Sequence, residues 1–173
     1  FYTSSHKGAW RYDIATRMTP SIPRGVSGMV AKTADENAQI SFRFKEKLPQ
    51  RSMRLQIFCE PNNSFDVLWV SGEDTVLIQP SLIHADSSYI EALIPSFDLE
   101  FTLICQKSEP RQSGFIFHGA NLLSAEDSGV VYHSLGVEGS GYAGILNADL
   151  FGAQLKALNP DLIVLDFSVA ELN

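Results

Sequence analysis

The chain has 173 residues, of which 45% are hydrophobic and 19% charged, and this is the composition of a folded globular protein. Its formal net charge is −7, so we expect no nucleic-acid partner, because an acidic surface repels phosphate backbones. No apolar run approaches the roughly 18 residues that a membrane span needs. The length suits one good-sized domain, or one domain with a fragment of another.

The first 25 residues show no regular hydrophobic pattern and are punctuated by Ser, Thr, Gly and Pro, so we expect an irregular segment there. Trp10 is the largest side chain of this segment. We interpret it as a packing anchor, because a tryptophan buries a large apolar area. A platform for stacking a sugar ring is the alternative.

Short strand patterns recur from residue 25 to residue 123, with turn signals between them. In one of them Ile40, Phe42 and Phe44 alternate with polar residues, which indicates a half-buried strand. The expected strands are 25–33, 38–46, 53–60, 65–70, 75–78, 88–94, 99–105 and 114–123. Spacing of about 8 to 14 residues is close to that of all-β sandwiches. The sequence therefore predicts a mainly β fold, with a jelly-roll-like, two-sheet antiparallel β-sandwich domain at residues 1–127.

The last third of the chain has a different pattern. Residues 130–135 are a β-rich run, a glycine-rich turn follows, and 148–158 carries apolar residues at helical spacing. Asn159-Pro160 ends this helix, because the residue before a proline is pushed out of the α region. Residues 162–167 are an apolar run interrupted only by Asp166, typical of a strand covered on both faces. We therefore expect a short C-terminal βαβ fragment over 128–173.

Two stretches of this region resemble SGNH (GDSL-type) hydrolases, in particular carbohydrate or peptidoglycan O-acetylesterases. GVEGSGY at 136–142 is similar to the family's G-V-N-G-A-x-Y turn, and PDLIVLDFSVAE at 160–171 is similar to its P-D-L-I-I-x-L-G-T-N-E strand. The resemblance implies that 128–173 is a fragment of the SGNH-type α/β domain. It also implies that 1–127 is an accessory domain, the carbohydrate-binding-module-like β-sandwich inserted in such enzymes. An extracytoplasmic location, periplasmic or secreted, is implied by the resemblance alone.

The resemblance supplies only part of an active site. The family's nucleophile lies in a Gly-Asp-Ser block and its acid–base pair in Asp-x-x-His, and this sequence contains neither motif. Gly139 falls at the glycine whose backbone N–H lines the oxyanion hole, and a turn with positive φ is the other explanation for it. Ala170 falls at the family's oxyanion-hole asparagine; losing such a donor costs about 3 kcal/mol. Asn173 takes that role only in a shifted frame, so enzymatic activity stays open.

Three functions are compatible with these observations. The favoured one is a non-catalytic, carbohydrate-binding-like accessory domain of an SGNH-type esterase that acts on acetylated glycans. The chain is alternatively part of a working hydrolase whose Ser and Asp/His lie outside it, or a purely structural or adhesion sandwich. The expected partners are a glycan or an acetylated polysaccharide, and the rest of the parent hydrolase. Trp69, Tyr89 and Tyr142 are the candidate ligand contacts, because sugar rings stack on exposed aromatic faces.

No metal or other cofactor is predicted, because Cys/His spacing suited to zinc is absent. The acidic turns at 35–36, 73–74 and 126–127 are interpreted as solvated, with calcium binding as the alternative. Cys59 and Cys105 lie in apolar runs, and we expect buried thiols rather than one disulfide. His118 lies in a predicted strand, where a lone histidine is usually a hydrogen-bonded structural residue.

Overall fold

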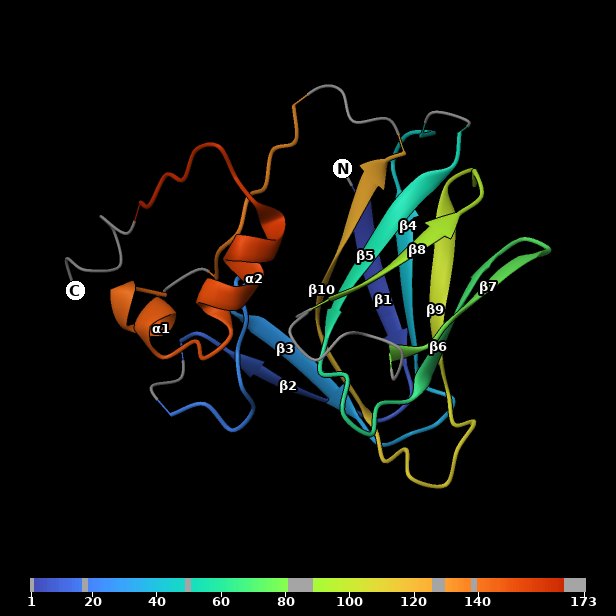
Figure 1. Cartoon of the computed structure of the whole chain (residues 1–173), viewed down its shortest axis with the longest axis horizontal. Helices are drawn as coiled ribbons and strands as arrows, with labels where there is room; N and C mark the ends of the chain where they lie inside the picture. The colour runs from blue at the N-terminus through green and yellow to red at the C-terminus, as the bar shows by residue number, and fades with distance from the viewer. Residues whose placement is uncertain are drawn as a thin grey trace.

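The computed structural model describes residues 2–16, 19–48, 51–80, 89–125, 130–137 and 140–166. Over these residues, two five-stranded antiparallel sheets enclose one hydrophobic core (Figure 1). The first sheet contains, in spatial order, β1 (Tyr2–Lys7), β4 (Gln39–Phe44), β9 (Glu100–Gln106), β6 (Asp66–Ser71) and β7 (Asp74–Ile78). The second contains β2 (Trp10–Ile14), β3 (Met29–Thr33), β10 (Phe115–Ser124), β5 (Met53–Cys59) and β8 (Tyr89–Ile94). The predicted mainly β, two-sheet sandwich is confirmed.

Inward-facing residues of β4 to β10 build most of the core between the sheets. Ile40 of β4 is buried, and Phe42 and Phe44 pack against the core, as the alternation in this segment predicted. Both cysteines, Cys59 of β5 and Cys105 of β9, are buried and unbridged. The prediction of buried thiols is therefore confirmed.

Strands β1 and β2 lie where the sequence predicted an irregular segment. β1 pairs with β4 along its whole length, and β2 pairs with β3. They are the edge strands of the two sheets, and every residue of β1 is exposed. The prediction was wrong because β1 buries no face and so carries no hydrophobic alternation, and because the fully buried residue of β2 is the charged Asp13.

Trp10, at the start of β2, is half-buried and packs against the core. Its indole N–H donates a hydrogen bond to the backbone oxygen of Lys7, with the two atoms 3.0 Å apart. The interpretation of Trp10 as a packing anchor is confirmed.

Two short helices follow the sandwich and lie beside β2 and β3 (Figure 1). They are α1 (Tyr142–Leu146) and α2 (Phe151–Leu158), and the second corresponds to the helix predicted at 148–158. α2 ends at Asn159, whose φ of 45° is left-handed, immediately before Pro160. With 5 and 8 residues, these described helices are too short to cross a membrane.

The two strands of the predicted βαβ fragment do not form over the described residues. Residues 130–135 and 162–166 are irregular, and their apolar side chains face solvent: Val130 is 97% exposed and Leu162 79% exposed. A parallel strand needs backbone hydrogen bonds from a neighbouring strand, and the described part of the chain places none beside them. These two strand predictions were therefore wrong here, with Phe167 outside the described residues.

Candidate functional site

The outer face of the first sheet is polar where β1, β4 and β9 lie side by side. The strand register places Arg43 opposite both Thr3 and Glu100, and it places Ser41 opposite Thr102. Because alternate residues of a strand share a face, these residues lie on the side away from the core. One surface thus carries hydroxyl, guanidinium and carboxylate groups together.

Two adjoining hollows mark this face, and we call them together the outer-face groove. The smaller, about 300 Å³, is lined by Thr3, Ser4, Ser5, Ser41, Phe42, Arg43, Glu100 and Thr102. The larger, about 440 Å³, is lined by Arg43, Ser71, Gly72, Glu73, Asp74, Ser96, Phe97, Asp98, Leu99 and Glu100. Both contain Arg43 and Glu100, so the hollows meet at this pair. Together they span β1, β4 and β9 and reach the turn between β6 and β7.

Hydrogen bonds fix the hydroxyl groups of the groove. The hydroxyl oxygens of Ser41 and Thr102 are 2.9 Å apart, and the Ser71 hydroxyl donates to the backbone oxygen of Glu100 at 2.7 Å. Arg43 and Glu100 form a long ion pair of 3.8 Å, with side chains 70% and 68% exposed. An exposed pair of this kind is worth about 0–1 kcal/mol, so both charged groups can turn to a ligand at little cost.

The groove is acidic. Its lining contains one cation, Arg43, against the four carboxylates of Glu73, Asp74, Asp98 and Glu100, a formal net charge of −3. Lys47, outside the lining, forms an ion pair with Asp98 at 2.8 Å. A surface of this charge attracts cations and repels polyanions.

The three predicted aromatic contacts do not form a common site. Trp69 is completely buried, with its ring centroid 6.1 Å from those of Phe97 and Phe101. A ring with no exposed face cannot stack on a sugar, so Trp69 is a core residue rather than a ligand contact. Tyr89 is half-buried on β8, and Tyr142 is 50% exposed on α1, beside the opposite edge of the second sheet (Figure 1).

Tyr89 and Tyr142 remain predictions as ligand contacts. Tyr89 packs on Phe58, with ring centroids 5.5 Å apart. The candidate oxyanion-hole residue Gly139 lies outside the described residues, as do Ala170 and Asn173.

The residues of the outer-face groove were missed from the sequence. The available signal was the alternation in 38–46, which leaves Ser41 and Arg43 on the face opposite Ile40. That pattern identifies a solvent-facing side of one strand. It does not reveal that Thr102, 61 residues away, lies directly beside Ser41.

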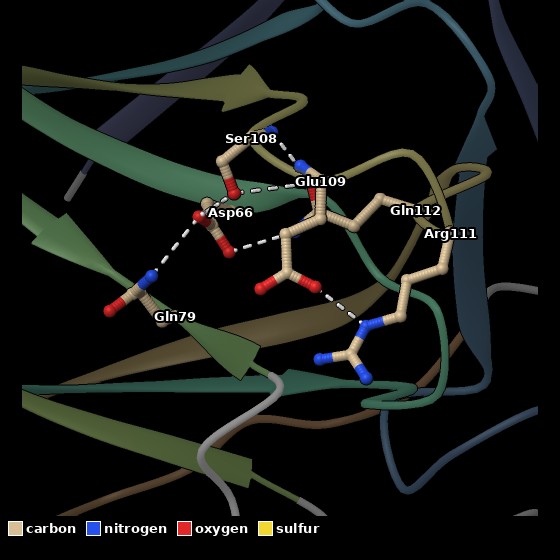
Figure 2. Close-up of polar contacts among 6 residues, drawn as sticks. All are labelled: Asp66, Gln79, Ser108, Glu109, Arg111 and Gln112. Atoms are coloured by element: carbon tan, nitrogen blue, oxygen red, sulfur yellow. Dashed lines mark hydrogen bonds and ion pairs between the residues drawn. The ribbon is translucent and has the colours of Figure 1, made fainter.

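A second polar cluster surrounds a buried carboxylate, Asp66, at the start of β6 (Figure 2). Asp66 accepts hydrogen bonds from the Ser108 hydroxyl at 2.6 Å and from the amide nitrogens of Gln112 and Gln79 at 3.0 and 3.3 Å. The side-chain oxygen Oε1 of Gln112 in turn accepts hydrogen bonds from the backbone N–H groups of Ser108 and Glu109. These bonds engage both carboxylate oxygens and fasten the loop between β9 and β10, so we assign the cluster a structural role.

Within the ranges that the structure describes, no group of three or more His, Cys, Asp or Glu side chains is placed to hold a metal ion. The absence of a cofactor stays a prediction, and calcium at the acidic turns stays its alternative. The turn at 126–127 lies outside the described residues.

His118 on β10 is buried, and burial lowers the pKa of its imidazole to about 4 from 6.5. Neither ring nitrogen has a hydrogen-bond partner among the described residues, which differs from the hydrogen-bonded histidine that the sequence predicted. The ring is therefore held neutral by its apolar surroundings. It sits beside a β-bulge, since the pairing of β10 with β5 shifts register between Phe117 and Gly119.

We expect His118 to make the fold acid-sensitive. Between its unfolded pKa of 6.5 and its folded pKa of about 4, the unfolded chain binds a proton that the folded chain does not. The free energy of unfolding therefore falls as pH falls through this window, by about 2 kcal/mol between about pH 7 and about pH 5. Urea unfolding at the two pH values measures this difference. His118→Leu should remove most of this difference in unfolding free energy, whereas His6→Gln, which replaces an exposed histidine, should leave the difference unchanged. If His118→Leu keeps the full difference, His118 is not its source.

Comparisons with known proteins assign no family. No family model matches the chain, and no curated protein matches it. Among solved structures, the Agl-KA catalytic domain is 7% identical with a TM-score of 0.41, over 77% of this chain and 29% of that chain. The enzymatically active domain of tailspike protein 4 of bacteriophage CBA120 is 13% identical with a TM-score of 0.36, over 70% of this chain and 19% of that chain.

This chain thus spans less than a third of the length of either structure. Likenesses at these scores carry no functional inference. None of these matches supports the SGNH resemblance.

Proposed function

We propose that this chain is a non-catalytic, carbohydrate-binding accessory β-sandwich that acts beside an SGNH-type esterase on acetylated glycans outside the cytoplasm. The observation that carries the binding role is the outer-face groove. Its hydroxyls, its guanidinium and its carboxylates supply the donors and acceptors that sugar hydroxyls require. The esterase context and the location rest only on the resemblance of 136–142 and 160–171 to that family.

The charge of the groove indicates which class of glycan it can bind. The lining contains four carboxylates and one guanidinium, so its net negative charge would repel a polyanionic glycan. An uncharged acetylated glycan, or one with free amino groups, is not repelled. We therefore propose a neutral or amino-sugar polymer as the ligand, with Arg43 and Glu100 as its central contacts.

A second function is favoured by the sequence GVEGSGY at 136–142. Val137 lies close to Gly28 of the sandwich, Ser140 lies close to Gly144, and the Ser140 N–H donates to the Val137 carbonyl oxygen at 3.0 Å. A glycine between two positioned flanks suits an oxyanion hole. On this proposal the chain is part of a working hydrolase whose Ser and Asp/His lie outside it.

Replacing Arg43 with alanine tests the binding role. A lost hydrogen bond to a charged group is worth about 1.5–3 kcal/mol, so the dissociation constant for a bound glycan should rise about tenfold or more. Affinity electrophoresis in gels that contain acetylated xylan, chitosan or polygalacturonate measures retention. We expect retention by acetylated xylan or chitosan and none by the polyanionic polygalacturonate.

The matched control is Arg11→Ala, which removes an exposed arginine from β2 in the other sheet. It should leave retention unchanged. Equal losses in both variants would contradict a site in the groove. If the native chain is retained by no polysaccharide, the carbohydrate role is overturned in favour of a structural or adhesion sandwich.

A further inference from the structure

One side chain–backbone hydrogen bond and one backbone–backbone hydrogen bond connect α2 and the residue before it to the sandwich. Gln154 of α2 is 1% exposed, and its side-chain oxygen accepts from the backbone N–H of Val26 at 3.0 Å. The backbone N–H of Leu150 donates to the backbone oxygen of Arg24 at 2.9 Å. Both contacts lie on residues 21–28, between β2 and β3, which we call the seat.

The seat is itself held rigidly by a buried ion pair. Asp13 accepts from the backbone N–H and the hydroxyl of Ser21 at 2.9 and 2.8 Å and from Nε of Arg24 at 2.7 Å, and both charged side chains are fully buried. Burial alone would raise the pKa of Asp13. The Ser21 and Arg24 interactions outweigh burial and lower the pKa to about 2, so the pair is ionised at neutral pH.

Two glycines of the seat allow this close fit. A Cβ atom on Gly25 would overlap the side chain of Gln154. Gly28 has a φ of +67°, which favours glycine, and a Cβ atom there would come within 3.2 Å of both Ala15 and Val137. The seat therefore contacts α2 at one end and the glycine-rich segment at the other.

We infer that the seat is a positioning device and that Gln154 is its positioning residue, holding residues 136–137 and 140–144 of the glycine-rich segment in a fixed place on the sandwich. Val137 contacts the seat directly, Ser140 is bonded to Val137, and the buried Gly144 lies against Ala15. Gly139 lies between these described flanks and outside the described residues. An oxyanion role for this segment depends on the second proposed function. The contact between the segment and the seat does not depend on that function.

The side-chain oxygen of Gln154 makes the hydrogen bond that connects α2 to the seat. This oxygen is bonded to Val26, while the side-chain amide nitrogen has no hydrogen-bond partner among the described residues. A replacement that keeps an oxygen acceptor should therefore preserve the attachment, and a replacement of similar size without one should break it. This distinguishes positioning through the Val26 hydrogen bond from simple filling of space.

Hydrogen exchange of the whole chain, followed by mass spectrometry, tests the inference. In Gln154→Leu, backbone amides of 24–28 and 140–150 should exchange about tenfold faster than in the native chain, because a buried N–H is left unpaired. Amides of β5 and β9 in the core should keep their native rates. Gln154→Glu should restore protection below about pH 5, where a protonated carboxyl still accepts from Val26, judged against the native chain at the same pH.

The matched control is Gln112→Leu, which removes an equally buried glutamine from the Asp66 cluster. It should speed exchange in 107–113 and leave 140–150 unchanged. Uniform acceleration throughout Gln154→Leu, unchanged rates at 140–150, or no restoration by Gln154→Glu would each overturn the inference. Glycan retention is tested at Arg43 and the role of Gln154 is tested by exchange of the amides of 24–28 and 140–150. The glycan-binding proposal and the positioning inference can therefore fail separately.

Discussion

Replacing Trp69 with alanine is expected to lower the free energy of unfolding by about 3–5 kcal/mol. Its side chain is completely buried, and it contacts the rings of Phe97 and Phe101 between the two sheets. The substitution removes that contact area and leaves a cavity that the packed strands cannot fill. Urea unfolding followed by far-UV circular dichroism measures the change.

Trp69→Phe is the matched control, because it keeps an aromatic ring in the cluster. The indole N–H of Trp69 has no hydrogen-bond partner among the described residues, so its loss leaves no described acceptor unpaired. We expect Trp69→Phe to cost less than half as much as Trp69→Ala. A Trp69→Ala protein that unfolds like the native chain but loses glycan retention would instead restore the ligand role.

Replacing Arg24 with methionine is expected to destabilise the fold by about 3–5 kcal/mol. The variant removes the Arg24 guanidinium from the Asp13 carboxylate, and both side chains are fully buried in the native chain. The pKa of Asp13 should rise, because burial raises it and Arg24 is one of the groups that lower it. Thermal unfolding at neutral and acidic pH measures both effects.

The double variant Asp13→Asn with Arg24→Met should regain part of the lost stability, because it also removes the buried charge of Asp13. Arg111→Met is the exposed comparison. Arg111 pairs with Glu109 at 2.7 Å, but the side chains are 66% and 49% exposed, and we expect a cost under about 1 kcal/mol. Equal costs for Arg24→Met and Arg111→Met would mean that burial of the Asp13–Arg24 pair contributes nothing.

The sequence predicted those parts of the fold that local pattern determines. The alternation around Phe42 identified β4 and its buried face, and Asn159-Pro160 marked the end of α2. Edge strand β1 was missed because it buries no face. Residues 162–166 have the apolar pattern of an interior strand, but a strand forms only beside a pairing partner, and no local pattern states whether one is present.

The candidate site depended still more on contacts distant in sequence. The groove exists because β1, β4 and β9 are neighbours, which brings Thr3, Arg43 and Glu100 together. The buried partners Asp13 and Arg24 lie in or beside a segment without periodicity, so nothing in the sequence singled them out. Trp69 was placed at a surface and lies in the core, because large aromatic side chains serve the core as readily as a surface.

The buried cysteines have a consequence for the conditions that this protein tolerates. Burial, assisted by Glu60, raises the pKa of the Cys59 thiol to about 12, and burial, assisted by Asp35, does the same for Cys105. Disulfide exchange and oxidation proceed through the thiolate, which at these pKa values is almost unpopulated near neutral pH. Both cysteines of the folded chain should therefore remain free thiols in an oxidising as well as in a reducing medium.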